Sequence, residues 1–231
     1  MHLRGSSSWQ FGHGDMGYLH TALVVRDAAQ LRVPPSADVP PPLAGDVPEA
    51  DVLPPGERAT AGQQWVAWWH RLIGQAIREA RQSVTPLPPG TDPDDFEDRI
   101  LHRFAGQKDV FDPPDFASLA DMEQLQSAAV ATFGVPRGWS RYQPDSAEEP
   151  ERFAWPVVRD AAESTAADLG ISVGEVTGYA HVLEVEGFWS YLAGPGCALC
   201  SAAVACDPLA AARLLREVFR SGHGPDTARA R

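Results

Sequence analysis

The stretch from Gly178 to Ala205, "GYAHVLEVEGFWSYLAGPGCALCSAAVA", decides the fold class. Its first ten residues alternate, with Tyr179, His181, Leu183 and Val185 on one side, as they would along a half-buried β-strand. Two further apolar runs, "FWSYLA" and "CALCSAAVA", flank the turn signal "AGPG". We therefore predict a three-stranded meander in this part of the chain.

Helices are predicted on both sides of this stretch. In "DPLAAARLLREVFRSG", which follows it, Asp207 stands at the N-cap position and Pro208 at the first helical position. Far upstream, Ala61–Gln82 carries Trp65, Trp68 and Trp69 at helical spacing, which indicates a helix with its tryptophans in the core.

Start and stop signals predict three more helices, over residues 92–104, 118–134 and 157–170. The third would turn five side chains inward: Val158, Ala161, Ala162, Thr165 and Leu169. The run "YLHTALVV" (Tyr18–Val25) is interpreted as a short strand. Together these elements predict an α+β fold. In it, a small antiparallel sheet, made of the C-terminal meander and an N-terminal strand, packs against about five helices.

Proline marks the predicted domain boundaries. Residues 33–56 hold eight prolines in 24 residues, which excludes a helix or a central strand. We therefore expect an N-terminal loop and strand (1–32), a proline-rich arm or linker (33–60), and a main α+β domain (61–222) that shares one fold with the N-terminal strand. A frayed tail (223–231) completes the chain. A docking sequence for an SH3-like partner is the alternative for the arm.

The charge balance bears on partners. The 231 residues include 31 acidic and 19 basic side chains, a net charge of −12. Such a chain has no electrostatic footprint for nucleic acid and no attraction to an anionic membrane. Residues 109–151 are especially acidic, with nine Asp or Glu against Arg137 and Arg141. We expect a protein partner, for which a basic one is electrostatically complementary.

The expected compartment is the cytoplasm. The N-terminus lacks the apolar segment of a signal peptide, and no run of 18 apolar residues suggests a membrane span. Three cysteines close together are not a disulfide framework. The chain has no asparagine and a single lysine, Lys108, which suggests a GC-rich bacterial genome.

The cysteines Cys197, Cys200 and Cys206 allow three interpretations. In a strand, Cys197 and Cys200 point to opposite faces and cannot bind one ion. We favour a strand of small residues, in which a free cysteine packs as a small apolar side chain. A structural metal site and a C-x-x-C redox pair are the alternatives. Cys206 directly precedes a helix and is a candidate reactive thiol if it is exposed.

Two further sets of residues are candidate sites. His13, Asp15 and His20 lie among glycines within eight residues and could bind a divalent metal. Glu184 and Glu186 share one face of a strand and could act as a general acid and base. Each set also has a plainer explanation, a loop with incidental histidines for the first and the solvent face of a strand for the second.

Signature motifs of common enzymes are missing, including a P-loop, a dinucleotide-binding G-x-G-x-x-G after a strand, a nucleophile elbow and H-E-x-x-H. We therefore predict a soluble, non-enzymatic protein–protein interaction module without a cofactor. One alternative is a small metal-dependent hydrolase that uses His13, Asp15 and His20. The other is a thiol-dependent protein that uses Cys197 and Cys200.

Overall fold

The computed structural model describes residues 9–84, 106–133 and 151–223. These residues belong to two compact units. The sheet unit comprises Met1–Asp15, Ala80–Thr85 and Pro150–Arg231, and the helical unit comprises Met16–Glu79 and Pro86–Glu149. Each unit is described by itself.

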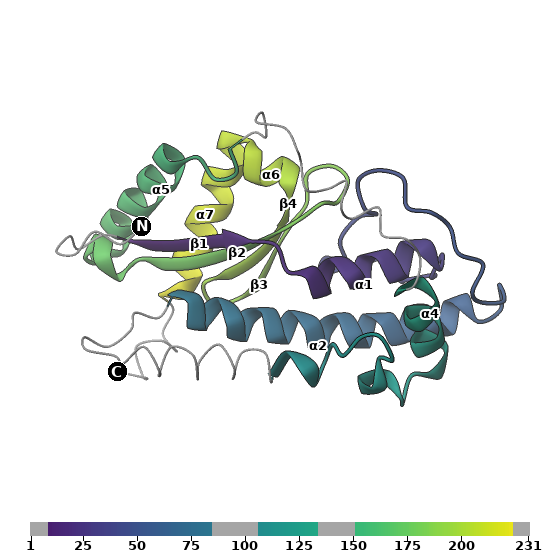
Figure 1. Cartoon of the computed structure of the whole chain (residues 1–231). Helices are drawn as coiled ribbons and strands as arrows, with labels where there is room; N and C mark the ends of the chain where they lie inside the picture. The colour runs from purple at the N-terminus through teal and green to yellow at the C-terminus, as the bar shows by residue number, and fades with distance from the viewer. Residues whose placement is uncertain (1–8, 85–105, 134–150, 224–231) are drawn as a thin grey trace. The chain divides into compact units, whose positions relative to one another are not determined.

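The sheet unit contains a four-stranded mixed sheet (Figure 1). Its strands are β1 (Gln10–Gly14), β2 (Thr177–Leu183), β3 (Ser190–Gly194) and β4 (Cys197–Ser201). Their order in space is β1-β2-β4-β3. β1 and β4 both run parallel to β2, and only β3 is antiparallel to its neighbour, β4. The predicted α+β class is confirmed, but the sheet is not antiparallel and its last three strands do not form a meander.

Burial explains why β4 lies between β2 and β3. All five residues of β4 are buried, whereas β3 exposes Ser190 and Leu192. A strand that is apolar on both faces belongs inside a sheet, and a partly exposed one belongs at its edge. The short turn between Gly194 and Cys197 allows β3 and β4 to pair as a hairpin, so β4 is the strand that reaches β2.

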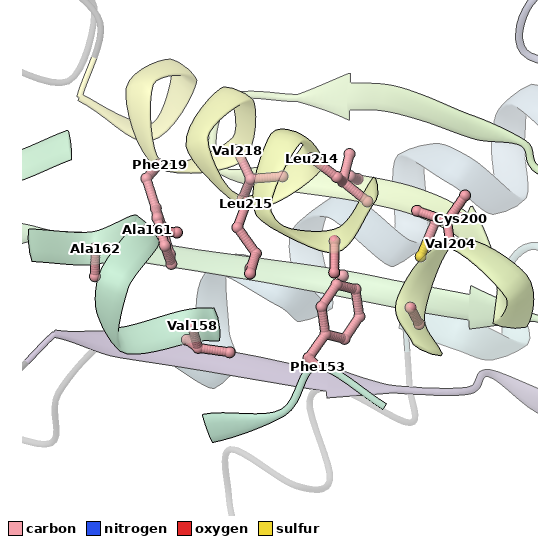
Figure 2. Close-up of a cluster of buried hydrophobic side chains, with 14 of the residues drawn as sticks. Phe153, Val158, Ala161, Ala162, Cys200, Val204, Leu214, Leu215, Val218 and Phe219 are labelled. Carbon is pink, nitrogen blue, oxygen red and sulfur yellow. The ribbon is translucent and has the colours of Figure 1, made fainter. Parts of the chain in front are cut away.

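Three helices cover one face of this sheet: α5 (Trp155–Leu169), α6 (Ala202–Cys206) and α7 (Pro208–Gly222) (Figure 1). Figure 2 shows the core that they share with the sheet, including Cys200, Val204, Leu215 and Phe219. Helix α7 lies close to β2 at Gly178, where an added Cβ would be 2.6 Å from Val218 Cγ1. The core therefore depends on small residues in the strands.

In the sheet unit, the start of α7 follows the sequence signal, and two other predictions need correction. Asp207 caps α7, because its Oδ1 accepts from the N–H groups of Leu209 and Ala210. Leu169 does not point inward as predicted, since it is 40% exposed at the end of α5. The third apolar run is a strand only as far as Ser201, whose hydroxyl accepts from the N–H of Val204 and starts α6.

The helical unit contains α1 (Gly17–Ala28), most of α2 (Arg58–Val84), the 3-10 turn Ala117–Leu119 and α4 (Glu123–Phe133). The strand predicted at Tyr18–Val25 is wrong, because this run lies inside α1. Leu19, Ala22 and Leu23 are buried at helical spacing. A short apolar run does not distinguish a buried strand from a buried helix, and the N-terminal strand lies just upstream as β1.

The helix predicted at Ala61–Gln82 is confirmed as α2, and its three tryptophans are fully buried. Each indole N–H donates to a backbone carbonyl: Trp65 to Ala22 (2.7 Å), Trp68 to Val110 (2.8 Å) and Trp69 to Asp38 (2.8 Å). The rings of Trp65 and Trp69 stack with centroids 5.2 Å apart. These tryptophans therefore hold α1, the arm and residue 110 around α2.

The proline-rich arm packs within the helical unit. The buried guanidinium of Arg26 donates to the carbonyls of Pro40 (2.6 Å) and Pro41 (2.8 Å) and forms an ion pair with Asp27. Asp27 in turn accepts from the N–H of Leu43 (2.8 Å). Side chain to backbone bonds of this kind replace the regular pairing that proline prevents.

The helix predicted at 118–134 is observed only from Glu123 onward, as α4. Ser118 does not form a capping box with Asp121, because its hydroxyl and N–H both bond to Asp112. The helix predicted at 92–104, together with Arg137 and Arg141, lies outside the described residues.

Candidate functional site

The cysteines are packing residues of β4 and α6. Cys197 and Cys200 are buried free thiols in β4, and burial raises the pKa of both to about 12. Cys200 faces the core under α5, α6 and α7 (Figure 2). A thiol with such a pKa stays protonated at neutral pH and is a poor nucleophile. Cys206, the last residue of α6, is only partly buried.

The predicted metal ligands lie in different units. His13 is in β1 and Asp15 follows that strand, whereas His20 is buried in α1 of the helical unit. Within residues 9–84, 106–133 and 151–223, no three His, Cys, Asp or Glu side chains are grouped so that they could hold a metal ion. The geometry of this part of the chain therefore lends no support to a three-ligand site.

Two residues from separate candidate sets, His13 and Glu184, interact with the same arginine. β1 and β2 are parallel neighbours, and His13 lies opposite Ala180, four residues before Glu184 in the chain. His13 lies near the end of β1, and Glu184 directly follows β2. Arg152 links them: its guanidinium lies 2.6 Å from Glu184 Oε1, and its charge acts on His13. We call His13, Arg152 and Glu184 the carboxyl-edge cluster.

The carboxyl-edge cluster favours a neutral imidazole. Partial burial lowers the pKa of His13, and the positive charge of Arg152 lowers it further. The ring packs beside Phe153 and Phe11, with centroids 5.6 and 6.1 Å away. A neutral imidazole can accept a proton. His13 is nevertheless exposed to solvent, and the carboxylate of Glu184 is engaged by Arg152, so the cluster is not a shielded acid–base pair.

Sequence reasoning missed Arg152, which precedes α5 in no recognisable motif. The predicted Glu184–Glu186 pair requires both residues to lie in one strand, but β2 ends at Leu183, before either of them. Glu186 is exposed beyond the strand, while Glu184 is only about a quarter exposed in its ion pair.

Besides Leu169 at the end of α5, the described part of the sheet unit exposes large apolar side chains at two places. Trp155 (56% exposed) and Leu209 (81%) lie at the starts of α5 and α7. These helices run in the same direction, since Asp168 and Arg220 pair near their other ends. We call this place the helix-start surface. Because large apolar side chains are exposed there, this surface is a candidate contact site for another molecule.

The second place is the β3 surface, formed by Phe188 (69% exposed) and Leu192 (39%). Leu192 lies in β3, an edge strand of the sheet, and Phe188 directly precedes that strand. Neither surface could be predicted from the sequence, because the residue type alone does not show whether an apolar side chain is exposed or buried in the core.

No protein-family model, curated protein or solved structure matches this chain. Among the helices of the described segments, none combines the length and the apolar character needed to cross a membrane.

Proposed function

We propose that this chain is a non-enzymatic protein–protein interaction module. The observation that carries the proposal is the exposure of Trp155, Leu209, Phe188 and Leu192 on the sheet unit. Large apolar side chains, aromatic ones above all, are the anchors from which protein interfaces gain most of their binding energy. Trp155 and Leu209 lie in helices and Leu192 in a strand, which gives these three anchors rigid support, and Phe188 lies just before β3.

The chemistry of the described residues also favours binding over catalysis. The Cys197 and Cys200 thiols have pKa values of about 12, which argues against a thiol-dependent mechanism. The carboxyl-edge cluster is exposed at His13, and solvent screens the charges of such a site. The net charge of −12 favours a basic partner through electrostatic steering.

Site-specific photo-crosslinking tests the proposal. A benzophenone amino acid replaces Leu209 or Phe188 in the full chain, expressed in the cell of origin, and adducts are identified by mass spectrometry. We expect one discrete partner, competed by excess wild-type chain. Glu163, an exposed residue of α5, is the matched control position and should give no such adduct. Equal, diffuse labelling at all three positions would contradict an interaction module.

A further inference from the structure

We propose that the outer edge of β3 binds a short, extended segment of a partner protein, which adds to the sheet as a further β-strand. The segment carries an apolar side chain that packs against Phe188 or Leu192 and a basic side chain near Glu186. This inference rests on the proposed function and names the surface and the chemistry of the partner.

The backbone of β3 provides the first argument. The carbonyl of Trp189 accepts from the N–H of Ser201 at 2.9 Å, so residue 189 faces the β4 side. Backbone groups along a strand alternate in direction, which turns Tyr191 toward Leu199 in β4 and turns Ser190 and Leu192 outward. In the part of the chain that the structure describes, no strand pairs with that outer side.

The composition of β3 provides the second argument. Natural edge strands are usually protected against pairing by lysine, proline or inward-pointing charges. The sequence of β3, "SYLAG", contains none of these. Its protection is limited to its short length and to the irregular register between Leu192 and Gly194. Such an edge accepts a segment of only a few residues, in the manner of β-strand addition.

Side chains at the edge indicate what the segment contains. Ser190 and Leu192 are exposed where a partner strand would lie, and Phe188 is exposed just before it. Among the residues that lead into β3, Glu184 is paired with Arg152, whereas Glu186 is exposed. An apolar segment with one Lys or Arg therefore complements this edge in both shape and charge.

A proline substitution separates backbone pairing from side-chain contact. Leu192→Pro removes an outward N–H that makes no bond to β4, and proline is tolerated at such edge positions. Leu192→Val keeps the N–H and is the matched control. The probe is a random peptide library displayed on phage and selected against the full wild-type chain, followed by affinity measurement with the enriched peptides.

We expect enriched peptides that alternate apolar residues around a Lys or Arg. Their affinity should fall at least tenfold in Leu192→Pro and less than threefold in Leu192→Val, with circular dichroism unchanged in both. If Leu192→Pro fails to fold, hydrogen exchange of the wild-type chain provides the test. The Ser190 and Leu192 amides should become protected from exchange when the peptide binds.

Other outcomes would overturn the inference. Equal affinity in the two variants, or peptide protection confined to other segments, would exclude strand addition at β3. A wild-type chain that sediments as a dimer and becomes a monomer in Leu192→Pro would assign the edge to a second copy instead. A specific crosslink at Leu209 without peptide binding at β3 would leave the proposed function standing while this inference fails.

Discussion

The positive charge of Arg152 lowers the pKa of His13, and this electrostatic interaction has a measurable consequence. We expect Arg152→Met to raise the pKa of His13, because the substitution removes a neighbouring positive charge and frees the Glu184 carboxylate. An NMR titration of the His13 ring measures the shift. In Glu184→Gln, the matched control, the arginine charge remains and the pKa should not rise. An unchanged titration in Arg152→Met would contradict the electrostatic effect of Arg152 on His13.

The same histidine gives the fold a dependence on pH. The pKa of His13 lies below the ordinary value of 6.5 in the folded chain, so the unfolded chain binds the proton more readily. Stability is therefore lost as the pH falls from 6.5 toward the folded pKa. We expect the drop in Tm between neutral and mildly acidic pH to be smaller in His13→Gln than in wild type. An identical drop in the two proteins would exclude this contribution.

The thiols should differ in reactivity according to burial. We expect iodoacetamide at mildly alkaline pH to modify Cys206 first, because Cys197 and Cys200 stay protonated and buried. Peptide mass spectrometry after timed quenching measures the order, and denatured chain, in which all three react, is the control. Native labelling of Cys200 as fast as Cys206 would contradict the packing of β4.

Residue-level features were predictable where they follow from local geometry. The burial of Trp65, Trp68 and Trp69 follows from helical spacing, and the opposite faces of Cys197 and Cys200 follow from strand alternation. Arg152 was not predictable, because its partner Glu184 lies 32 residues away and no motif joins them. Contacts of that kind depend on topology, which a single sequence does not specify.

At the scale of elements, two glycines of α2 should respond oppositely to alanine. A Cβ at Gly62 would lie 2.2 Å from the carbonyl oxygen of Arg32, so Gly62→Ala must displace the start of the arm. We expect a loss of about 1–3 kcal/mol. At Gly74 an added Cβ would meet only the side chain of Arg78 in the same helix, at 3.7 Å from Nη1, and alanine should add up to about 1 kcal/mol through helix propensity.

Urea unfolding of both variants, followed by circular dichroism, measures the difference. Equal free energies of unfolding for Gly62→Ala and Gly74→Ala would show that the arm does not pack against the start of α2.

Elements with caps or long periodic patterns were predicted well, and short apolar runs were not. Asp207 marked the start of α7, and tryptophan spacing marked α2. The strand prediction for Tyr18–Val25 was wrong because a short run of apolar residues suits a buried helix as well as a strand. The predicted order of the last three strands was wrong for another reason. The sequence indicates both β3 and β4 as apolar runs, but only the burial of β4 on both faces shows that β4 lies inside the sheet.

At the scale of the whole molecule, the sheet unit carries the proposed binding function. The exposed Phe188 and Leu192 do not belong to its helix-covered core around Cys200 and Phe219. The acidic charge of the chain should make association with a basic segment weaken as salt concentration rises. Composition suggests a basic partner, which stays a prediction, whereas the surface proposed to bind it could be identified only from the observed strand order.

Hydrogen exchange of the β3 amides in the free, full-length chain is the most direct measurement. If the outer edge of β3 is open, the Ser190 and Leu192 amides exchange much faster than that of Tyr191, which is directed toward β4. Slow exchange at all three residues in the free chain would show that the edge is already paired, and the proposed binding surface would not exist.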